Sequence, residues 1–318
     1  MKDFRPLPNA PSIANTTSLA KFLGIDWPLL KNVSENIELN WRPGKPKQKP
    51  DGSIRVTHSG SPILKKIHKS INRKILSAVY YPSYLHGGIK NNPDGTNRNH
   101  ISNAKLHRGK RLIISADIAG FFPSVNELVI RNIWQCFFPF APDVAGLLTR
   151  LTSYQNELPQ GWGTSSYLAQ LVFWDNEYLL CQTLRQRGIK YSRYIDDFTL
   201  STNQTLTKES ITRLFRDLTL MCMQKGARLK GKKCKVESKY RPQTVNKLGV
   251  NSGQISLLPK YRKNLRARVH QFVLKRTQIN PDEYASQMRS IRGQISYLRK
   301  FHPNQASQLE IMLSEHIR

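Results

Sequence analysis

The chain has 318 residues, and its 50 Lys and Arg against 21 Asp and Glu give a formal net charge of +29. Such a surface repels itself unless polyanions neutralise it, and nucleic acid is the obvious polyanion. A hydrophobic fraction of 39% is ordinary for a globular protein with a buried interior, which excludes a disordered tail.

A membrane surface is the competing partner for so basic a chain. No stretch approaches the ~20 apolar residues of a membrane-spanning helix, and the apolar stretch 137–148 contains two prolines and an aspartate. The first 23 residues carry no apolar run long enough for a signal peptide. We therefore expect a soluble, cytoplasmic protein without a membrane partner.

The first hundred residues predict short strands and one basic helix. Residues 1–40 form an N-terminal extension, and the sequence leaves open whether it folds alone or packs against the segment that follows it. Residues 44–56 are rich in Pro, Gly and Lys and carry an Asp51-Gly52 turn signal, which predicts a hairpin between two short strands. Residues 61–82 have the apolar spacing of an amphipathic helix, and the Gly- and Asn-rich residues 87–103 predict a loop.

The middle of the chain alternates strand and helix patterns. Residues 110–125 open as an apolar strand that ends at Asp117. Residues 126–151 predict helix with irregular breaks, and residues 158–188 predict a turn followed by one long helix. Residues 189–202 predict two short β runs on either side of two adjacent aspartates.

The two adjacent aspartates, Asp196 and Asp197, require an explanation because neighbouring carboxylates resist ionising together unless a cation lies between them. Two divalent ions about 3.5 to 4 Å apart assist in-line phosphoryl transfer, and Mg²⁺ prefers oxygen ligands. With a third carboxylate from a neighbouring strand, Asp117, the pair is a candidate site for two Mg²⁺ ions. A solvated acidic turn is the alternative explanation.

The remainder of the chain is mostly helical and basic. Residues 208–226 predict an amphipathic helix, and residues 227–239 a basic strand-like segment. From residue 259 to residue 318 the pattern is helical, with Asn280 as a helix cap before Pro281. A mixed body followed by a small basic helical lobe is the predicted organisation.

Four motifs follow one another along the chain: KPDGSIR at 49–55, ADIAGFF at 116–122, LPQG at 158–161 and YIDD at 194–197. Reverse transcriptases carry similar motifs in this order, and the chain resembles this family, most of all the bacterial retron type, over about residues 45–300. YIDD at 194–197 resembles the catalytic turn, and ADIAGFF at 116–122 resembles the strand of the other catalytic aspartate. LPQG at 158–161 is similar to a turn of the nucleotide pocket, and KPDGSIR at 49–55 to the fingertip hairpin.

The likeness to retron enzymes depends on NAKLH at 103–107, which is similar to their Asn-Ala-x-x-His signature. The chain departs from the family at Lys247-Leu248-Gly249, where retron enzymes carry Val-Thr-Gly, so an RNA contact there stays open. Ile195 stands where many relatives have alanine.

The resemblance implies an α+β, right-hand polymerase fold with fingers, a palm that contains an antiparallel sheet and helices, and a small helical thumb. The implied boundaries are an N-terminal extension over 1–40, fingers over 41–110 with part of 126–165, a palm over 111–255 and a helical thumb over 256–318.

The resemblance also assigns site residues. The catalytic and metal-binding residues would be Asp117, Asp196 and Asp197. The dNTP-binding residues would be Lys49 and Arg55 on the triphosphate, Phe122 as a wall against a ribose hydroxyl, Gln160 and Gly161 in the pocket, and Lys233 as a candidate general acid. The RNA-binding residues would be Asn103, His107, Arg262, Lys263, Arg266 and Arg268, the last four on the duplex backbone.

The implied function is an RNA-directed DNA polymerase that uses a structured noncoding RNA as template and primer. Its product would be a branched RNA–DNA hybrid (msDNA), and retron enzymes act in anti-phage defence with a separate effector protein. The alternatives are another bacterial reverse transcriptase, of the group II intron or abortive-infection type, and an RNA-binding scaffold without catalysis.

Overall fold

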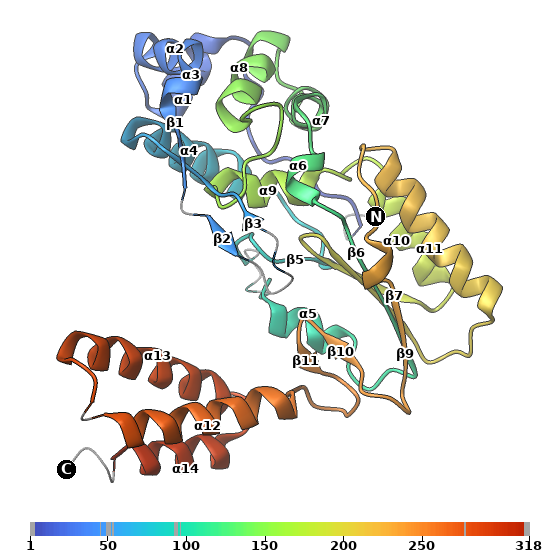
Figure 1. Ribbon diagram of the computed structural model, residues 1–318. Helices are drawn as coiled ribbons and strands as arrows, with labels where there is room; N and C mark the ends of the chain where they lie inside the picture. Colours follow the sequence, from blue (N-terminus) through green and yellow to red (C-terminus); the bar gives the residue numbers. More distant parts are fainter. Residues whose placement is uncertain are drawn as a thin grey trace. The chain divides into compact units, whose positions relative to one another are not determined.

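The computed structural model describes residues 4–44, 46–48, 52, 54–91, 95, 97–276 and 278–314 (Figure 1). The chain divides into two compact units, Met1–Asn103 with Leu112–Val236, and Ala104–Arg111 with Glu237–Arg318. No helix in the described part of the chain is both long and apolar enough to cross a lipid bilayer.

The N-terminal extension packs onto the rest of the first unit. Its helices are α1 (Thr16–Leu23), α2 (Trp27–Glu35) and α3 (Ile37–Asn40). Helix α1 contacts α4 (Pro62–Lys74) and α8 (Pro142–Thr152), and α2 contacts α8. The Ser70 hydroxyl of α4 donates a hydrogen bond to the carbonyl of Leu23 at 2.5 Å. The extension therefore shares the core of this unit.

Two short antiparallel strand pairs precede α4. Strand β1 (Trp41–Pro43) pairs with β4 (His58–Gly60), and β2 (Lys47–Gln48) pairs with β3 (Ile54–Arg55). The predicted hairpin is thereby confirmed, although Asp51 of its predicted turn lies outside the described residues.

The predicted basic helix forms, but it is shorter than its apolar pattern suggests. Ser61 caps α4 by accepting a hydrogen bond from the Leu64 N–H at 3.2 Å. The helix ends at Lys74 and is followed by the 3₁₀ turn η1 (Leu76–Ala78). Leu64 and Ile71 are fully buried, so the apolar face of α4 forms part of the core.

The prediction of a loop through residue 103 is wrong at its end, where α5 (His100–Leu106) begins. The Asn99 side chain accepts hydrogen bonds from the N–H groups of Ile101 and Ser102, both at 2.9 Å. An asparagine that satisfies the free N–H groups of a first turn starts a helix, even within an Asn-rich segment.

The central sheet has the order β5-β7-β8-β6-β9. Its strands are β5 (Leu85–His86), β6 (Leu112–Asp117), β7 (Lys190–Tyr194), β8 (Asp197–Thr202) and β9 (Lys235–Ser238). Strand β8 runs antiparallel to both β6 and β7, and β5 runs parallel to β7. The predicted antiparallel sheet is confirmed in its core. Its register places Asp117 opposite Asp197.

The helical segment over 126–151 is broken, as predicted. It comprises α7 (Glu127–Asn132), the π-helical turn η2 (Ile133–Phe137) and α8, and the short helix α6 (Phe121–Ser124) precedes it.

The prediction of one long helix after residue 158 is wrong, because the chain forms α9 (Gly163–Leu171) and α10 (Glu177–Gln186) with a break between them. The break residue Asp175 pairs with Lys225 at 2.6 Å, and Asn176 has a non-helical backbone with φ −132°. The break turns Glu177 into the interior, where it is 1% exposed. The buried pairing of Glu177 with Arg193 thus overrides helix periodicity here.

The last elements of the first unit come after the sheet strands β7 and β8. Helix α11 (Lys208–Met223) is capped by Thr207, which confirms the helix predicted over 208–226. The segment predicted as strand-like over 227–239 contains the 3₁₀ turn η3 (Gly231–Lys233) and only then β9.

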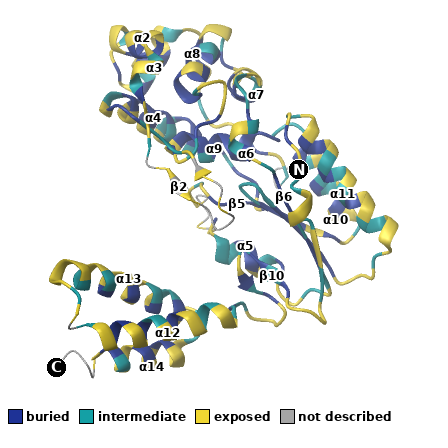
Figure 2. Ribbon diagram, viewed as in Figure 1, coloured by how far each residue is buried: buried dark blue, intermediate teal, exposed yellow. Residues whose placement is uncertain are grey.

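The second unit contains a small sheet and three helices. The sheet strands are β10 (Thr244–Val245), β11 (Leu248–Gly249) and β12 (Ser256–Leu257). The helices are α12 (Pro259–Lys275), α13 (Pro281–Arg299) and α14 (Pro303–Ser314), and their buried residues face one another inside this lobe (Figure 2). Asn280 caps α13 by accepting a hydrogen bond from the Glu283 N–H at 2.9 Å, as predicted.

Candidate active site

Three carboxylates, from the ends of β6 and β8 and from the turn between β7 and β8, meet at one end of the central sheet. Asp117 is the last residue of β6, Asp197 is the first of β8, and Asp196 precedes it in the turn. One ligand oxygen from each lies within 4.8 Å of the others. Asp117 is buried, and the other two are half-buried. The structure thus brings together the three acids that the sequence singled out.

Hydrogen bonds with neighbouring segments hold the backbone of the turn between β7 and β8. Ile195 at its tip has φ +59°, a left-handed conformation that is strained for a β-branched residue. Its N–H donates to the carbonyl of His86 at 3.1 Å, and the N–H of Ile118 donates to the carbonyl of Asp196 at 3.1 Å. These contacts position the aspartates beside β6.

Burial and repulsion from its neighbours disfavour ionisation of Asp197. Burial raises the pKa of Asp197 from 3.8 to about 7, and a hydrogen bond with Asp117 and the charge of Asp196 act in the same direction. A nearby cation would reverse this effect because it favours the ionised carboxylates. The site therefore favours the binding of cations.

Lys233 supplies one such charge. Its ammonium lies 2.7 Å from Oδ2 of Asp117, and this hydrogen bond raises the pKa of Lys233. The side chain is 51% exposed, so it reaches the acids from the solvent side. The backbone before it is fixed, since the N–H of Lys230 donates to the carbonyl of Asp117 at 2.7 Å.

The donor set fits hard divalent cations. It consists of carboxylate oxygens alone, the ligands that Mg²⁺ and Mn²⁺ prefer. Within the residues that the structure describes, no other three His, Cys, Asp or Glu side chains come this close together. Two of the three acids are only half-buried, which leaves ligand positions for a phosphate-bearing substrate.

Of the other residues predicted for the nucleotide pocket, Phe122 lies on α6, and Gln160 and Gly161 lie in the turn before α9. Phe122 is half-buried beside Phe121, whose ring is buried and stacks on Phe173 at 5.9 Å. The carbonyl of Gln160 accepts a hydrogen bond from the His58 N–H of β4 at 3.3 Å. Gly161 has φ +82°, a conformation that favours glycine at this turn.

The two predicted triphosphate ligands are only partly covered by the structure. Lys49 lies outside the described residues, and of Arg55 the structure describes the backbone in β3. Their contacts with a nucleotide stay a prediction.

The predicted RNA-binding residues differ in exposure. Asn103 and His107 of α5 and the turn after it are both fully buried. On α12, Lys263 and Arg266 are exposed and Arg262 and Arg268 half-buried. Arg262, Lys263 and Arg266 line a hollow of about 580 Å³ against α14. Their RNA contacts stay a prediction, and the exposed cations of α12 are the more accessible set.

Sequence reasoning missed two buried charged residues behind the turn, Arg193 and Glu177. Arg193 directly precedes the YIDD motif, and a charged residue inside an otherwise buried strand is the signal that could have found it. Nothing in the sequence identifies Glu177 as its partner.

Comparison with known proteins places these motifs in a family. The family of reverse transcriptases (RNA-dependent DNA polymerases) matches residues 46–252. The chain is 29% identical over 317 residues to the retron Se72 reverse transcriptase of Salmonella heidelberg, covering 98% of this chain and 82% of that protein. It is 26% identical over 282 residues to the retron Ec48 reverse transcriptase of Escherichia coli, covering 86% and 68%.

Two solved structures are distantly similar. The foamy viral protease-reverse transcriptase aligns with 97% of this chain and 45% of its own, at 14% identity and a TM-score of 0.45. The alignment with telomerase from Candida albicans covers 98% of this chain and 71% of the telomerase chain, at 12% identity and a TM-score of 0.47.

Proposed function

Because the chain belongs to the reverse transcriptase family, as an RNA-directed DNA polymerase of the retron type, we propose that it copies a structured noncoding RNA that is both template and primer. Synthesis begins from a guanosine 2′-hydroxyl of that RNA and yields a branched RNA–DNA hybrid (msDNA). We propose that the fingers comprise residues 41–110 with part of 126–165, the palm residues 111–255 and the thumb residues 256–318, after the N-terminal extension over 1–40. The reaction takes place in the cytoplasm, in anti-phage defence beside a separate effector protein.

The observation that carries the proposal is the convergence of Asp117, Asp196 and Asp197 within 4.8 Å at the end of a sheet in a chain with a net charge of +29. We assign these three acids as the ligands of two Mg²⁺ ions, which when bound activate the attacking hydroxyl and stabilise the leaving oxygen. The chain's own contribution is to hold the three carboxylates on a rigid sheet edge.

Lys233 is the proposed proton donor to the leaving pyrophosphate. Its ammonium lies 2.7 Å from Asp117 and its side chain is half-exposed, so it can reach a phosphate without entering the core. A raised pKa keeps this lysine protonated until the leaving group develops charge.

The incoming dNTP is proposed to lie between the fingertip hairpin and the acids. Lys49 and Arg55 neutralise the triphosphate, and the LPQG turn with Gln160 and Gly161 borders the base. The half-buried ring of Phe122 excludes a ribose 2′-hydroxyl, which selects deoxynucleotides.

Nucleic acid is proposed to bind through backbone contacts and shape. The exposed Lys263 and Arg266, with Arg262 and Arg268, contact phosphates of the template–product duplex. Asn103 and His107 are buried, so we propose that they support the RNA-contacting surface of α5 from inside.

Sequencing the nucleic acid that co-purifies from the native host tests this function. A single species with a DNA stretch that stays joined to RNA, and that incorporates labelled dNTPs when Mg²⁺ is added, is the expected result. A spread of unrelated transcripts without attached DNA would contradict the use of one structured RNA. Lys263→Glu with Arg266→Glu should lose the co-purified species while the protein stays folded.

A further inference from the structure

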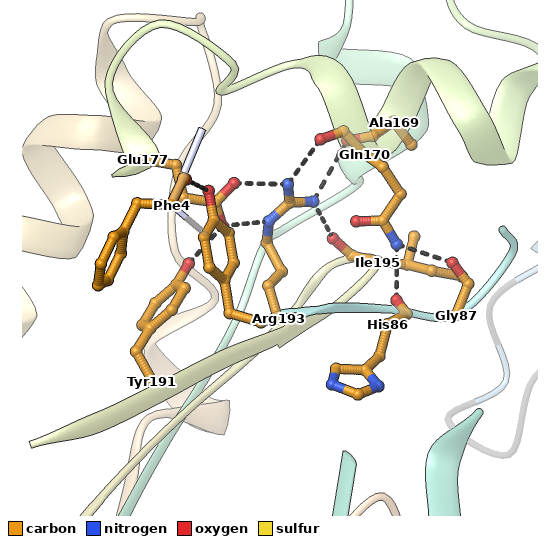
Figure 3. A network of polar contacts seen from close by, with 10 residues as sticks. Phe4, His86, Gly87, Ala169, Gln170, Glu177, Tyr191, Arg193 and Ile195 are labelled. Atoms are coloured by element: carbon orange, nitrogen blue, oxygen red, sulfur yellow. Dashed lines mark hydrogen bonds and ion pairs between the residues drawn. The ribbon is translucent and has the colours of Figure 1, made fainter. Parts of the chain in front are cut away.

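A buried arginine lies directly behind the turn that carries the catalytic aspartates (Figure 3). Arg193 is 0% exposed, and its guanidinium donates to the carbonyl of Ile195 at 2.8 Å. It is held by Glu177, which is 1% exposed. We propose that Arg193 is a positioning residue for the polymerase reaction, because it fixes the backbone from which Asp196 and Asp197 project.

The Arg193–Glu177 pair has the geometry of a rigid support. Nε and Nη2 of Arg193 each lie 2.7 Å from one oxygen of the Glu177 carboxylate, and the Tyr191 hydroxyl donates to the same carboxylate at 2.6 Å. Such two-point pairing fixes the plane of the guanidinium. A fully buried ion pair is costly to desolvate and adds little stability compared with apolar residues. Its position behind the turn therefore calls for a reason other than stability.

The guanidinium connects three elements. Besides the carboxylate of α10 it contacts the last turn of α9, where the carbonyls of Ala169 and Gln170 accept hydrogen bonds at 3.2 and 3.0 Å (Figure 3). It also donates to the carbonyl of Ile195 in the turn. The break between α9 and α10 is what allows all of these groups to meet at one side chain.

Ile195 is the residue that needs this support. Its left-handed φ of +59° disfavours a β-branched side chain, so the turn relaxes unless its backbone groups are held. Its N–H is held by the carbonyl of His86, which in turn accepts a hydrogen bond from the Gln170 amide at 2.6 Å. Its carbonyl is held by Arg193. The two contacts together lock the peptide groups on both sides of the tip.

Loss of the carbonyl contact frees the strained residue and lets the two aspartates shift relative to Asp117. A displacement of about 1 Å at a reacting group can cost on the order of 100-fold in rate. The inference rests on the proposed metal site, since positioning matters through the carboxylates. The effect belongs mainly to the chemical step, because the proposed dNTP-binding residues Lys49, Arg55 and Gln160 lie on other segments of the chain.

Glu177→Gln and Asp175→Asn form a matched pair of variants. Both remove a carboxylate charge isosterically, two residues apart, and both break an ion pair: Glu177 with Arg193, and Asp175 with Lys225 at 2.6 Å. Only the partner of Glu177 contacts the turn. We expect Glu177→Gln to lower kcat by roughly tenfold or more with the KM for dNTP changed less than about twofold. Asp175→Asn should keep the kcat of the unaltered chain.

Arg193→Lys is the second variant, and it carries the test if Glu177→Gln does not fold. Lysine keeps the charge but lacks the planar fork, so it cannot hold the carboxylate and the Ile195 carbonyl together. It should lower kcat as Glu177→Gln does.

Hydrogen exchange supplies a readout that is independent of catalysis. In the metal-free full-length protein, exchange in a peptide covering residues 190–200 should be faster in Glu177→Gln and Arg193→Lys, and unchanged in Asp175→Asn. The affinity for Mn²⁺, measured by electron paramagnetic resonance, should also fall in the same two variants. Unchanged exchange in both, or an equal loss of kcat in Glu177→Gln and Asp175→Asn, would overturn the positioning role. Asp196→Asn in the same kinetic assay tests the proposed metal site separately. If Asp196→Asn keeps its activity, the proposed metal site is wrong. If it loses activity while the variants of Glu177 and Arg193 do not, only the positioning role is wrong.

Discussion

Asp197 stands in an environment that makes its negative charge unfavourable without a partner cation. Burial and two neighbouring acids raise its pKa to about 7, while Lys233 alone lowers it. Each pKa unit corresponds to about 1.4 kcal/mol, so the metal-free protein carries on the order of 4 kcal/mol of unfavourable interaction at this residue above neutral pH. The same arrangement favours divalent cations, because binding them relieves that repulsion.

The stability of the metal-free protein should depend on pH through this residue. A carboxyl whose pKa is raised in the folded state binds its proton more tightly there, so folding is favoured at low pH. Relative to Asp197→Asn, the unaltered chain should lose stability as pH rises from about 4 to about 7, and show no further loss above that range. Thermal unfolding in EDTA measures the difference between the two proteins. A difference that does not vary with pH would contradict the raised pKa.

Asp197→Asn should separate stability from activity. The amide removes the buried charge, so the variant should unfold at a higher temperature than the unaltered chain in EDTA at pH 8. It should also lose at least about 100-fold in DNA synthesis, because a metal ligand is gone. The exposed Asp143 is the control, and Asp143→Asn should change neither property appreciably. Primer extension and thermal unfolding on the same preparations provide both values.

Among single residues, the sequence predicted the three acids but not the buried Arg193–Glu177 pair that holds the turn. Adjacent aspartates in a basic chain are visible as a pattern, and the strand-end position of Asp117 is too. The Arg193–Glu177 pair is not, because the two residues belong to different elements and only tertiary packing joins them. Lys233 was predicted near the pyrophosphate, whereas its contact with Asp117 is a feature that the sequence did not reveal.

Among the elements, helix boundaries were set by local caps and by long-range polar contacts. The periodicity of residues 158–188 predicted one helix, yet the chain breaks between α9 and α10, and Glu177 turns inward there to pair with Arg193. Asn99 likewise started α5 inside a segment rich in loop-forming residues. Where apolar spacing and caps agreed, as in α11 and α13, the prediction is confirmed, whereas α4 forms but ends earlier than predicted.

The N-terminal helices should be essential to the stability of the first unit. Leu30 of α2 is 0% exposed, whereas its neighbour Leu29 is 41% exposed. Leu30→Ala should therefore lower the free energy of unfolding by about 2–5 kcal/mol, and Leu29→Ala by less than about 1 kcal/mol. Denaturant unfolding followed by tryptophan fluorescence measures both. Equal, small losses would mean that the extension does not share the core.

For the whole molecule, the net charge of +29 makes electrostatics central to nucleic-acid binding. Binding of a duplex could depend on contacts with particular Lys and Arg side chains, or only on the net charge of the whole chain. Lys263 and Arg266 are exposed on α12, and Lys208 and Arg213 are exposed on α11. The two pairs carry the same charge on different elements, so they separate the two explanations.

Lys263→Ala with Arg266→Ala should weaken binding of an RNA–DNA duplex and reduce the slope of log K against log salt by roughly one for each lost phosphate contact. Lys208→Ala with Arg213→Ala removes the same charge and should leave the slope close to that of the unaltered chain. Fluorescence anisotropy titrations at several salt concentrations measure the slopes. Equal reductions in both double variants would show that only the overall charge matters.

The three acids from two strands and one turn are proposed to hold two divalent ions together. Anomalous scattering from crystals of the protein with its RNA, an incoming dNTP and Mn²⁺ measures this directly. Two manganese peaks about 3.5 to 4 Å apart, each coordinated by oxygens of Asp117, Asp196 or Asp197, are the predicted result. Manganese bound elsewhere in the protein, with these three carboxylates uncoordinated beside a bound dNTP, would contradict it.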